Sequence, residues 1–155
     1  MLVFRIAKTA YIRDLSGMGA RLYGGRWNHK GIAVLYSSET RSLATVEYLV
    51  HVPLAYVPDD LSIATLTIPD DIDREDIPLS ALPRNWRSFP PPSELAELGT
   101  SWVLSNRSLT LRVPSTVVEH EYNVLINPAH PDFSRVVLAE VEKYTFDKRL
   151  LRLEM

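Results

Sequence analysis

Residues 23 to 47 contain three short segments in close succession: Tyr23-Gly-Gly-Arg-Trp-Asn28, then Ala33-Val-Leu-Tyr-Ser-Ser38, then Leu43-Ala-Thr-Val-Glu47. The glycine pair predicts a tight loop. The apolar run Ile32 to Tyr36 predicts a buried strand, and Ser37 and Ser38 are candidate helix N-caps. Residues 39 to 51 contain neither glycine nor proline and predict a helix that ends before Pro53. A loop, a strand and a helix are therefore expected around Arg26, Tyr36 and Glu47.

The predicted helix places a carboxylate on its inner side. At about 100° per residue, Leu43, Val46 and Val50 form one apolar stripe, and Glu47 falls on the same side. Burying a charge without a partner costs several kcal/mol. Glu47 therefore requires a buried partner or a substrate, and Arg26 is the obvious partner.

The remaining chain is rich in predicted strands. These are Leu2 to Ile6, Leu61 to Ile68, Leu109 to Val113, Tyr122 to Ile126 and Val136 to Val141, with helices at Ser93 to Leu104 (Ser93 as N-cap) and Phe146 to Leu153. Residues 8 to 25 hold four of the six glycines and are expected to form loops. The proline-rich residues 72 to 92 are expected to form an ordered loop. This order predicts an α+β fold with a mixed or antiparallel sheet and few helices.

Composition indicates one soluble domain, residues 1 to 155. The chain is 46% hydrophobic and 23% charged, with a net charge of −2 and no cysteine. Without a run of basic residues, direct nucleic-acid binding is not expected. There is also no segment with the length of a signal peptide or a membrane span, so we expect a cytoplasmic protein without membrane contact.

Several common site motifs are missing from the sequence. No histidine pair has HxxxH or HExxH spacing, so no metal site is expected. Neither GxGxxG nor GxxxxGK[ST] occurs, which argues against a Rossmann or P-loop nucleotide site. No GxSxG motif marks a hydrolase serine.

Each conspicuous side chain has two interpretations. Arg26 is either a surface arginine of a hairpin or an anion clamp next to the amide groups of Gly24 and Gly25. Tyr36 is either a core aromatic or a surface on which a flat ring stacks. Arg26 and Glu47 together form either a structural ion pair or a substrate site. Ser115, which follows Pro114 at a strand end, is also suited to act only as an N-cap.

Taken together, these residue types suit cleavage of a nicotinamide N-glycosidic bond. Arginine binds a pyrophosphate, tyrosine stacks on a ring, and a carboxylate stabilises an oxocarbenium-like transition state. One carboxylate suffices, because nicotinamide leaves as a neutral molecule and needs no general acid.

The same motifs resemble the RES-domain family, the toxins of RES–Xre toxin–antitoxin systems. The resemblance rests on Gly24-Gly-Arg-Trp-Asn28, Val34-Leu-Tyr-Ser-Ser38, Leu43-Ala-Thr-Val-Glu47, Val113-Pro-Ser115 and Asn127-Pro-Ala-His-Pro131. It runs from about Phe4 to beyond Phe133, which is nearly the whole chain. The order and spacing of several separate motifs make it specific.

The resemblance implies an ADP-ribosyltransferase-like fold and consumption of NAD⁺ as a substrate, with no cofactor. It assigns Glu47, Arg26 and Tyr36 as catalytic residues. Arg26, Tyr36, Ser115 and Asn127 would bind NAD⁺, although Asn127 is equally suited to shaping a turn. It also implies a cognate Xre-type antitoxin with a helix-turn-helix part and leaves room for a homodimer in the toxin–antitoxin complex. The acceptor of the ADP-ribosyl group is water, phosphate or a protein side chain.

Two other functions compete with this one. The first is a non-catalytic binding module in which Arg26–Glu47 is a structural ion pair. The second is an RNA-cleaving toxin, which the composition disfavours because RNA binding requires a basic groove.

Overall fold

The computed structural model describes residues 1–152, which form a seven-stranded sheet of order β4-β5-β6-β2-β1-β3-β7. All neighbouring strands are antiparallel except β4 and β5, which are parallel. The α+β class with a mixed sheet is thereby confirmed. The strands are β1 (Leu2–Lys8), β2 (Leu35–Ser38), β3 (Leu61–Thr67), β4 (Arg74–Asp76), β5 (Thr110–Pro114), β6 (Tyr122–Ile126) and β7 (Val137–Tyr144).

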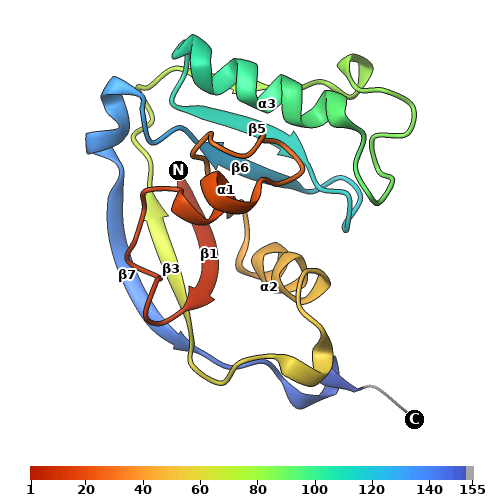
Figure 1. The fold of residues 1–155 in the computed structure, drawn as a ribbon. Helices are drawn as coiled ribbons and strands as arrows, with labels where there is room; N and C mark the ends of the chain where they lie inside the picture. Colours follow the sequence, from red (N-terminus) through yellow and green to blue (C-terminus); the bar gives the residue numbers. More distant parts are fainter. Residues whose placement is uncertain (153–155) are drawn as a thin grey trace.

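Three α-helices accompany the sheet in the described residues: α1 (Met18–Tyr23), α2 (Arg41–Val50) and α3 (Ser93–Ser105). Short 3₁₀ turns lie at Leu54–Tyr56, Leu79–Ala81, Pro131–Arg135 and Lys148–Leu151. In Figure 1, β1, β3 and β7 run at a steep angle to β5 and β6, and α2 lies on the inside of this bend while α3 runs along β5. The sheet thus offers α2 a concave surface.

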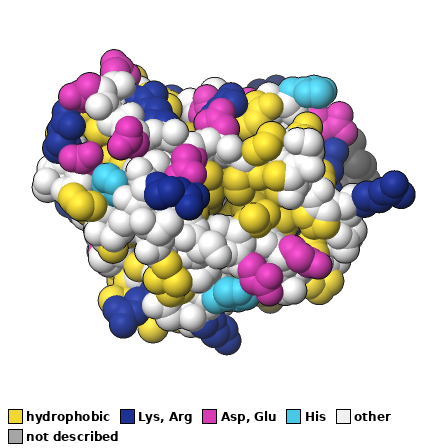
Figure 2. Space-filling view, turned by 90° about the horizontal axis from the view of Figure 1, so that it is seen from above, with side chains coloured by type: hydrophobic (Ala, Val, Ile, Leu, Met, Phe, Trp, Pro, Cys, Tyr) yellow, Lys and Arg dark blue, Asp and Glu magenta, His cyan; other side chains and the backbone are white. Residues whose placement is uncertain are grey.

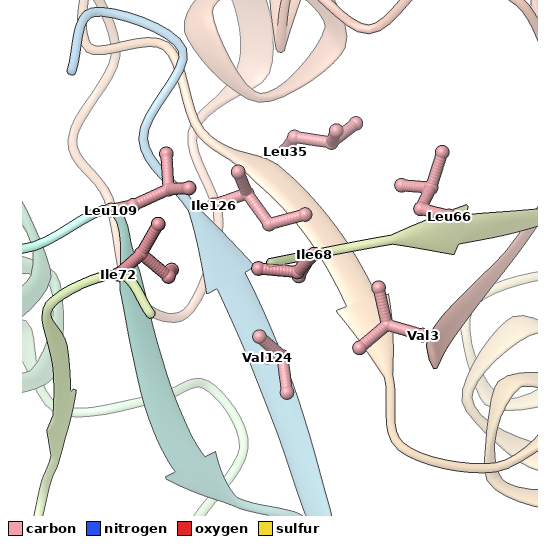
Figure 3. Close-up of a cluster of buried hydrophobic side chains, with 8 residues drawn as sticks. All are labelled: Val3, Leu35, Leu66, Ile68, Ile72, Leu109, Val124 and Ile126. Carbon is pink, nitrogen blue, oxygen red and sulfur yellow. The ribbon is translucent and has the colours of Figure 1, made fainter. Parts of the chain in front are cut away.

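Alternation along the strands divides the core into two clusters. Val124 and Ile126 belong to the first cluster and Leu125 to the second, so the clusters lie on opposite faces of the sheet. Figure 3 shows the first cluster, made of Val3, Leu35, Leu66, Ile68, Ile72, Leu109, Val124 and Ile126. The second contains Trp27, Val34, Leu95, Trp102, Val103, Leu111, Val113 and Leu125, and anchors α3.

The strand expected at Ile32 to Tyr36 is wrong in its position. The observed strand, β2, begins at Leu35 and includes both serines, because each serine hydroxyl finds a partner on β6: Val124 O for Ser37 and Asn123 Oδ1 for Ser38. Neither serine caps α2. The Thr40 side chain does so by accepting a hydrogen bond from the Leu43 amide (3.0 Å).

Other boundaries also differ from expectation. Residues 8 to 25 are not all loop, because α1 forms between Gly17 and Gly24, which both have positive φ. The proline-rich segment contains β4, a three-residue strand at the sheet edge. Helix α3 begins at Ser93 without a side-chain cap. Near the C-terminus only Lys148–Leu151 is helical, as a 3₁₀ turn, and Leu153 lies outside the described residues.

The surface carries both signs of charge. On the face shown in Figure 2, acidic and basic side chains are interspersed, and no broad basic area covers it. None of the helices within residues 1–152 has the combined length and apolarity needed to cross a bilayer.

Candidate active site

A tight turn presents Arg26 to a cavity. Gly25 and Asn28 form an isolated antiparallel bridge, with the Gly25 amide 3.0 Å from Asn28 O. A Cβ on Gly25 would lie 2.8 Å from the Tyr36 hydroxyl oxygen, so this position has no room for a larger residue. Gly25 therefore allows the turn to pack directly against Tyr36.

Tyr36 ties the turn to β2. Its hydroxyl donates to Asn28 Oδ1 (2.6 Å) and accepts from the Trp27 amide (3.2 Å). Burial raises the pKa of the Tyr36 phenol, which is only partly offset by the Trp27 hydrogen bond and by Arg26. The phenol is therefore neutral at physiological pH, and its hydroxyl holds the turn while its ring lines the cavity.

Arg26 is held by main-chain carbonyls. Its Nη1 donates to Trp86 O (2.9 Å) and Ser88 O (3.2 Å), which belong to the proline-rich segment. Desolvation lowers the pKa of the Arg26 guanidinium, and the nearby charge of Glu47 opposes this shift. An arginine keeps its positive charge even so. Its Nη2 and Nε make no hydrogen bond within residues 1–152, so they remain available to an anion.

Arg26 and Glu47 do not form an ion pair. Of the described basic side chains, only His51 comes within 4.0 Å of Glu47, from Nε2 to Oε2. The His51 side chain is 71% exposed and that of Glu47 is 19% exposed. The structural pair considered from the sequence is therefore absent, and the Glu47 carboxylate is stabilised by other groups.

Two neutral side chains hold one oxygen of Glu47. Ser115 Oγ donates to Oε1 (2.7 Å), and Asn123 Nδ2 donates to the same oxygen (2.8 Å). These residues come from the end of β5 and from β6, whereas Glu47 is on α2. The helix thus presents Glu47 to the sheet, as its inner position predicted, although Val50 on the expected apolar stripe is 57% exposed.

The hydrogen-bonding capacity of Ser115 is fully used. Its Oγ accepts from the amides of Val117 and Val118, each at 3.1 Å, and its one proton goes to Glu47. Its main-chain amide donates to Glu121 O (2.9 Å). Ser115 therefore acts on the site through Glu47 in this structure.

Contacts with the C-terminal part of the chain fix the rotation of α2. Thr45 shares a short hydroxyl–hydroxyl hydrogen bond with Tyr144 on β7. Tyr48 stacks on Phe146 with ring centroids 5.8 Å apart, and Tyr144 meets Phe146 edge-on at 5.0 Å. Thr45 and Tyr48 flank Glu47, so these contacts direct the carboxylate towards the cavity.

Arg26, Tyr36 and Glu47 line one cavity of about 1210 Å³. Asn123 and Arg87 also line it. Arg87 joins the proline-rich segment to the loop after β5, since its Nη1 lies 2.7 Å from Glu119 Oε1 and its Nη2 donates to Thr116 O (3.1 Å). The cavity thus combines a cation, an aromatic ring and an oriented carboxylate.

Asn127 lies apart from this group. It is fully buried, and its Nδ2 donates to Val103 O (3.1 Å) and Asn106 Oδ1 (3.0 Å). Its Oδ1 accepts from the Ala129 amide (2.9 Å). These bonds join the end of α3 to the turn after β6, which agrees with the turn-shaping interpretation.

The sequence alone did not single out Asn28, Arg87 or Asn123. Asn123 interrupts an otherwise apolar strand next to the tyrosine that begins β6, which is a weak signal for an inward polar group. Its importance depends on the pairing of β6 with β2. Within residues 1–152 no cluster of three or more histidine, aspartate or glutamate side chains is arranged to hold a metal ion.

Comparison with family models gives a match to the RES domain over residues 2–147. The chain belongs to the RES domain family. Among curated RES relatives, "Toxin Res" of Yersinia enterocolitica is 38% identical over 157 residues, covering 97% of this chain and 99% of the relative. "Prs ADP-ribosylating toxin" of Sphingobium sp. is 36% identical over 148 residues, covering 94% and 92%.

A solved structure shares the fold of this RES domain. The toxin–antitoxin complex titled MbcT-MbcA, from M. tuberculosis, contains a chain that superposes with a TM-score of 0.77 at 17% identity. The match covers 97% of this chain and 86% of that one. At such low identity the likeness establishes the architecture alone.

Proposed function

We propose that this RES-domain protein is a toxin that consumes NAD⁺ by breaking the bond between nicotinamide and ribose. The observation that carries the proposal is the geometry of Glu47. Its Oε1 is held by Ser115 and Asn123, whereas its Oε2 has no hydrogen bond within residues 1–152 and belongs to a side chain that lines the shared cavity. A carboxylate oriented in this way is suited to stabilising positive charge that develops on a substrate.

In the proposed reaction, the bond between ribose C1′ and the nicotinamide nitrogen breaks. Its electron pair moves to the ring nitrogen, which loses its positive charge, and an oxocarbenium-like ribose remains. Glu47 stabilises this cation and binds a ribose hydroxyl. An acceptor oxygen or nitrogen then bonds to C1′ and releases its proton.

Arg26 and Tyr36 bind the two ends of the reacting half of NAD⁺, the pyrophosphate and the nicotinamide. Arg26 presents Nη2 and Nε to the pyrophosphate while Nη1 stays on the two carbonyls. The Tyr36 ring orients nicotinamide. Ser115 takes the role of holding Glu47 in place of the direct contact with NAD⁺ that the family resemblance implies. Asn127 takes no part in substrate binding.

The acceptor is water, inorganic phosphate or a protein. The name of the relative "Prs ADP-ribosylating toxin" supports transfer of the ADP-ribosyl group to an acceptor over simple hydrolysis. The non-catalytic alternative loses its main support, since Arg26 and Glu47 form no ion pair. RNA cleavage receives no support from the mixed charge of the face shown in Figure 2.

We also propose that an antitoxin binds this protein and controls the cavity. The structural neighbour is part of a toxin–antitoxin complex, which supports such a partner. The Xre type, the helix-turn-helix part and a homodimer within the complex follow from the family resemblance. A neighbouring gene for a helix-turn-helix protein whose co-expression prevents toxicity would support this assignment, and a failure to neutralise would contradict it.

The deciding experiment incubates the purified protein with NAD⁺ and measures released nicotinamide. Three reactions contain water alone, added phosphate, or a protein extract as acceptor. We expect release in at least one of them. An intact NAD⁺ pool in all three would refute the proposed function.

A further inference from the structure

Ser38 and Asn123 lie opposite one another in the sheet. They are direct partners in the antiparallel pairing of β2 with β6. The Ser38 hydroxyl is 2.7 Å from Asn123 Oδ1, and Asn123 Nδ2 is 2.8 Å from Glu47 Oε1. A continuous hydrogen-bonded chain therefore runs from β2 through β6 to the carboxylate on α2.

This arrangement determines which way the Asn123 amide faces. A carboxylate accepts hydrogen bonds only, so Asn123 must turn its NH₂ group towards Glu47. Its carbonyl oxygen then faces Ser38, whose hydroxyl donates to it. Without the Ser38 donor, a flip of the Asn123 amide would cost less free energy. The flipped amide would point its oxygen at the Glu47 carboxylate.

Ser115, which directly follows β5, approaches the same carboxylate oxygen. With two donors on Oε1, rotation of the Glu47 carboxylate would break both bonds, so Oε2, which lies 4.0 Å from His51 Nε2, is kept as the oxygen without a hydrogen bond within residues 1–152. A displacement of about 1 Å at a reacting group can cost roughly 100-fold in rate. Groups that hold Glu47 therefore influence turnover through the position of its carboxylate.

We infer that Ser38 and Asn123 are positioning residues that hold Glu47 with Oε2 towards the substrate. This inference rests on the proposed NAD⁺ cleavage. It predicts a loss in kcat with little change in KM, because the hydrogen-bonded chain from Ser38 to Glu47 fixes the reacting carboxylate and not the phosphate or nicotinamide contacts.

Ser37 provides a matched control for Ser38. The two side chains are 5% and 4% exposed, and each hydroxyl makes one 2.7 Å hydrogen bond to β6. Ser37 donates to a main-chain carbonyl, that of Val124, and although it also lines the cavity, its side chain has no hydrogen bond to Asn123 or Glu47. Ser37→Ala and Ser38→Ala should therefore lower stability similarly, but only Ser38→Ala disturbs Glu47.

Nicotinamide release is measured below the unfolding midpoints of both variants. We expect Ser38→Ala to lower kcat about 10-fold, Ser38→Thr to retain most of the rate, and Ser37→Ala to match the wild type. Equal rates for the two alanine variants would overturn the inference. A rise in KM for Ser38→Ala at constant kcat would overturn it as well, since it would indicate a substrate contact.

Asn123 provides a second test. Asn123→Asp replaces the donor by a like charge next to Oε1, and we expect kcat to fall about 100-fold. In an Asn123→Ala background, Ser38→Ala should cause no further loss, because the two residues act in one chain. Additive losses in kcat for the Ser38→Ala and Asn123→Ala changes would contradict a single hydrogen-bonded chain. Inactivity of the wild-type protein would refute the proposed function itself, whereas an active wild type with equal serine variants would refute only the positioning roles.

Discussion

The two sides of the cavity hold their charged groups by different means. Glu47 is held by the side chains of Ser115 and Asn123, whose positions follow from the register of the sheet. Arg26 is held by the main-chain carbonyls of Trp86 and Ser88. The carboxylate side is therefore sensitive to the identity of its partners, whereas the arginine side depends on the path of the proline-rich segment.

The largest effect is expected on the carboxylate side, for Glu47→Gln. Glutamine keeps the shape and an oxygen for Ser115 and Asn123 but carries no charge to stabilise the oxocarbenium. We expect kcat to fall at least about 1000-fold, roughly 4 kcal/mol in the barrier, with the thermal midpoint little changed. If the free energy of unfolding instead falls by about 3 kcal/mol while activity persists, Glu47 has a structural role.

The next largest effect is expected where α3 packs against the turn that carries Arg26. A Cβ on Gly99 of α3 would lie 1.7 Å from the main-chain oxygen of Trp27, so Gly99→Ala must push the helix and the arginine turn apart. We expect a loss of about 3 kcal/mol in the free energy of unfolding, measured with urea. Gly19→Ala in α1 is the control, because no atom lies within 4 Å of its Cβ. Equal stability of the two variants would contradict this packing.

Arg26→Lys tests the grip on pyrophosphate. A lysine cannot keep hydrogen bonds to the two carbonyls of Trp86 and Ser88 and also present two donors to a phosphate group. We expect KM for NAD⁺ to rise about 30-fold, equivalent to roughly 2 kcal/mol, with a smaller change in kcat. Arg21→Lys, on the exposed side of α1, should leave both constants unchanged. A selective loss of kcat would place Arg26 with the carboxylate side instead.

The smallest effect is expected for Arg87→Ala. Arg87 and Glu119 are both exposed, and such pairs contribute about 0 to 1 kcal/mol. We expect KM to rise about 2- to 3-fold, and we expect added salt to raise the KM of the wild type by a similar factor. Arg135→Ala removes a comparable exposed pair with Asp71 and should leave KM unchanged. Equal KM values for both variants would show that the Arg87 link does not shape the site.

Features set by local sequence were predictable, whereas features set by contacts between distant residues were not. The inner position of Glu47 was predictable because helical periodicity is local. The turn at Gly24 and Gly25 was predictable from composition, but α1, which lies between two glycines, was not. Strand β4 has only three residues, two of them acidic, and its pairing with β5 depends on distant contacts.

The partners of the charged groups required the fold. Asn123 meets Ser38 only through the register of β2 with β6, which no local pattern specifies. The partners of Arg26 are carbonyls, which every residue carries, so no residue type marks them. Ser115 was identified through the family resemblance, and its bond to Glu47 gives it a physical role.

The most direct test is the crystal structure of the Glu47→Gln protein soaked with NAD⁺. We expect the pyrophosphate within hydrogen-bonding distance of Arg26, the nicotinamide ring against Tyr36, and the ribose C1′ facing the side chain of residue 47. NAD⁺ bound with its nicotinamide end away from residue 47, or no NAD⁺ in the cavity at saturating concentration, would contradict the proposed site.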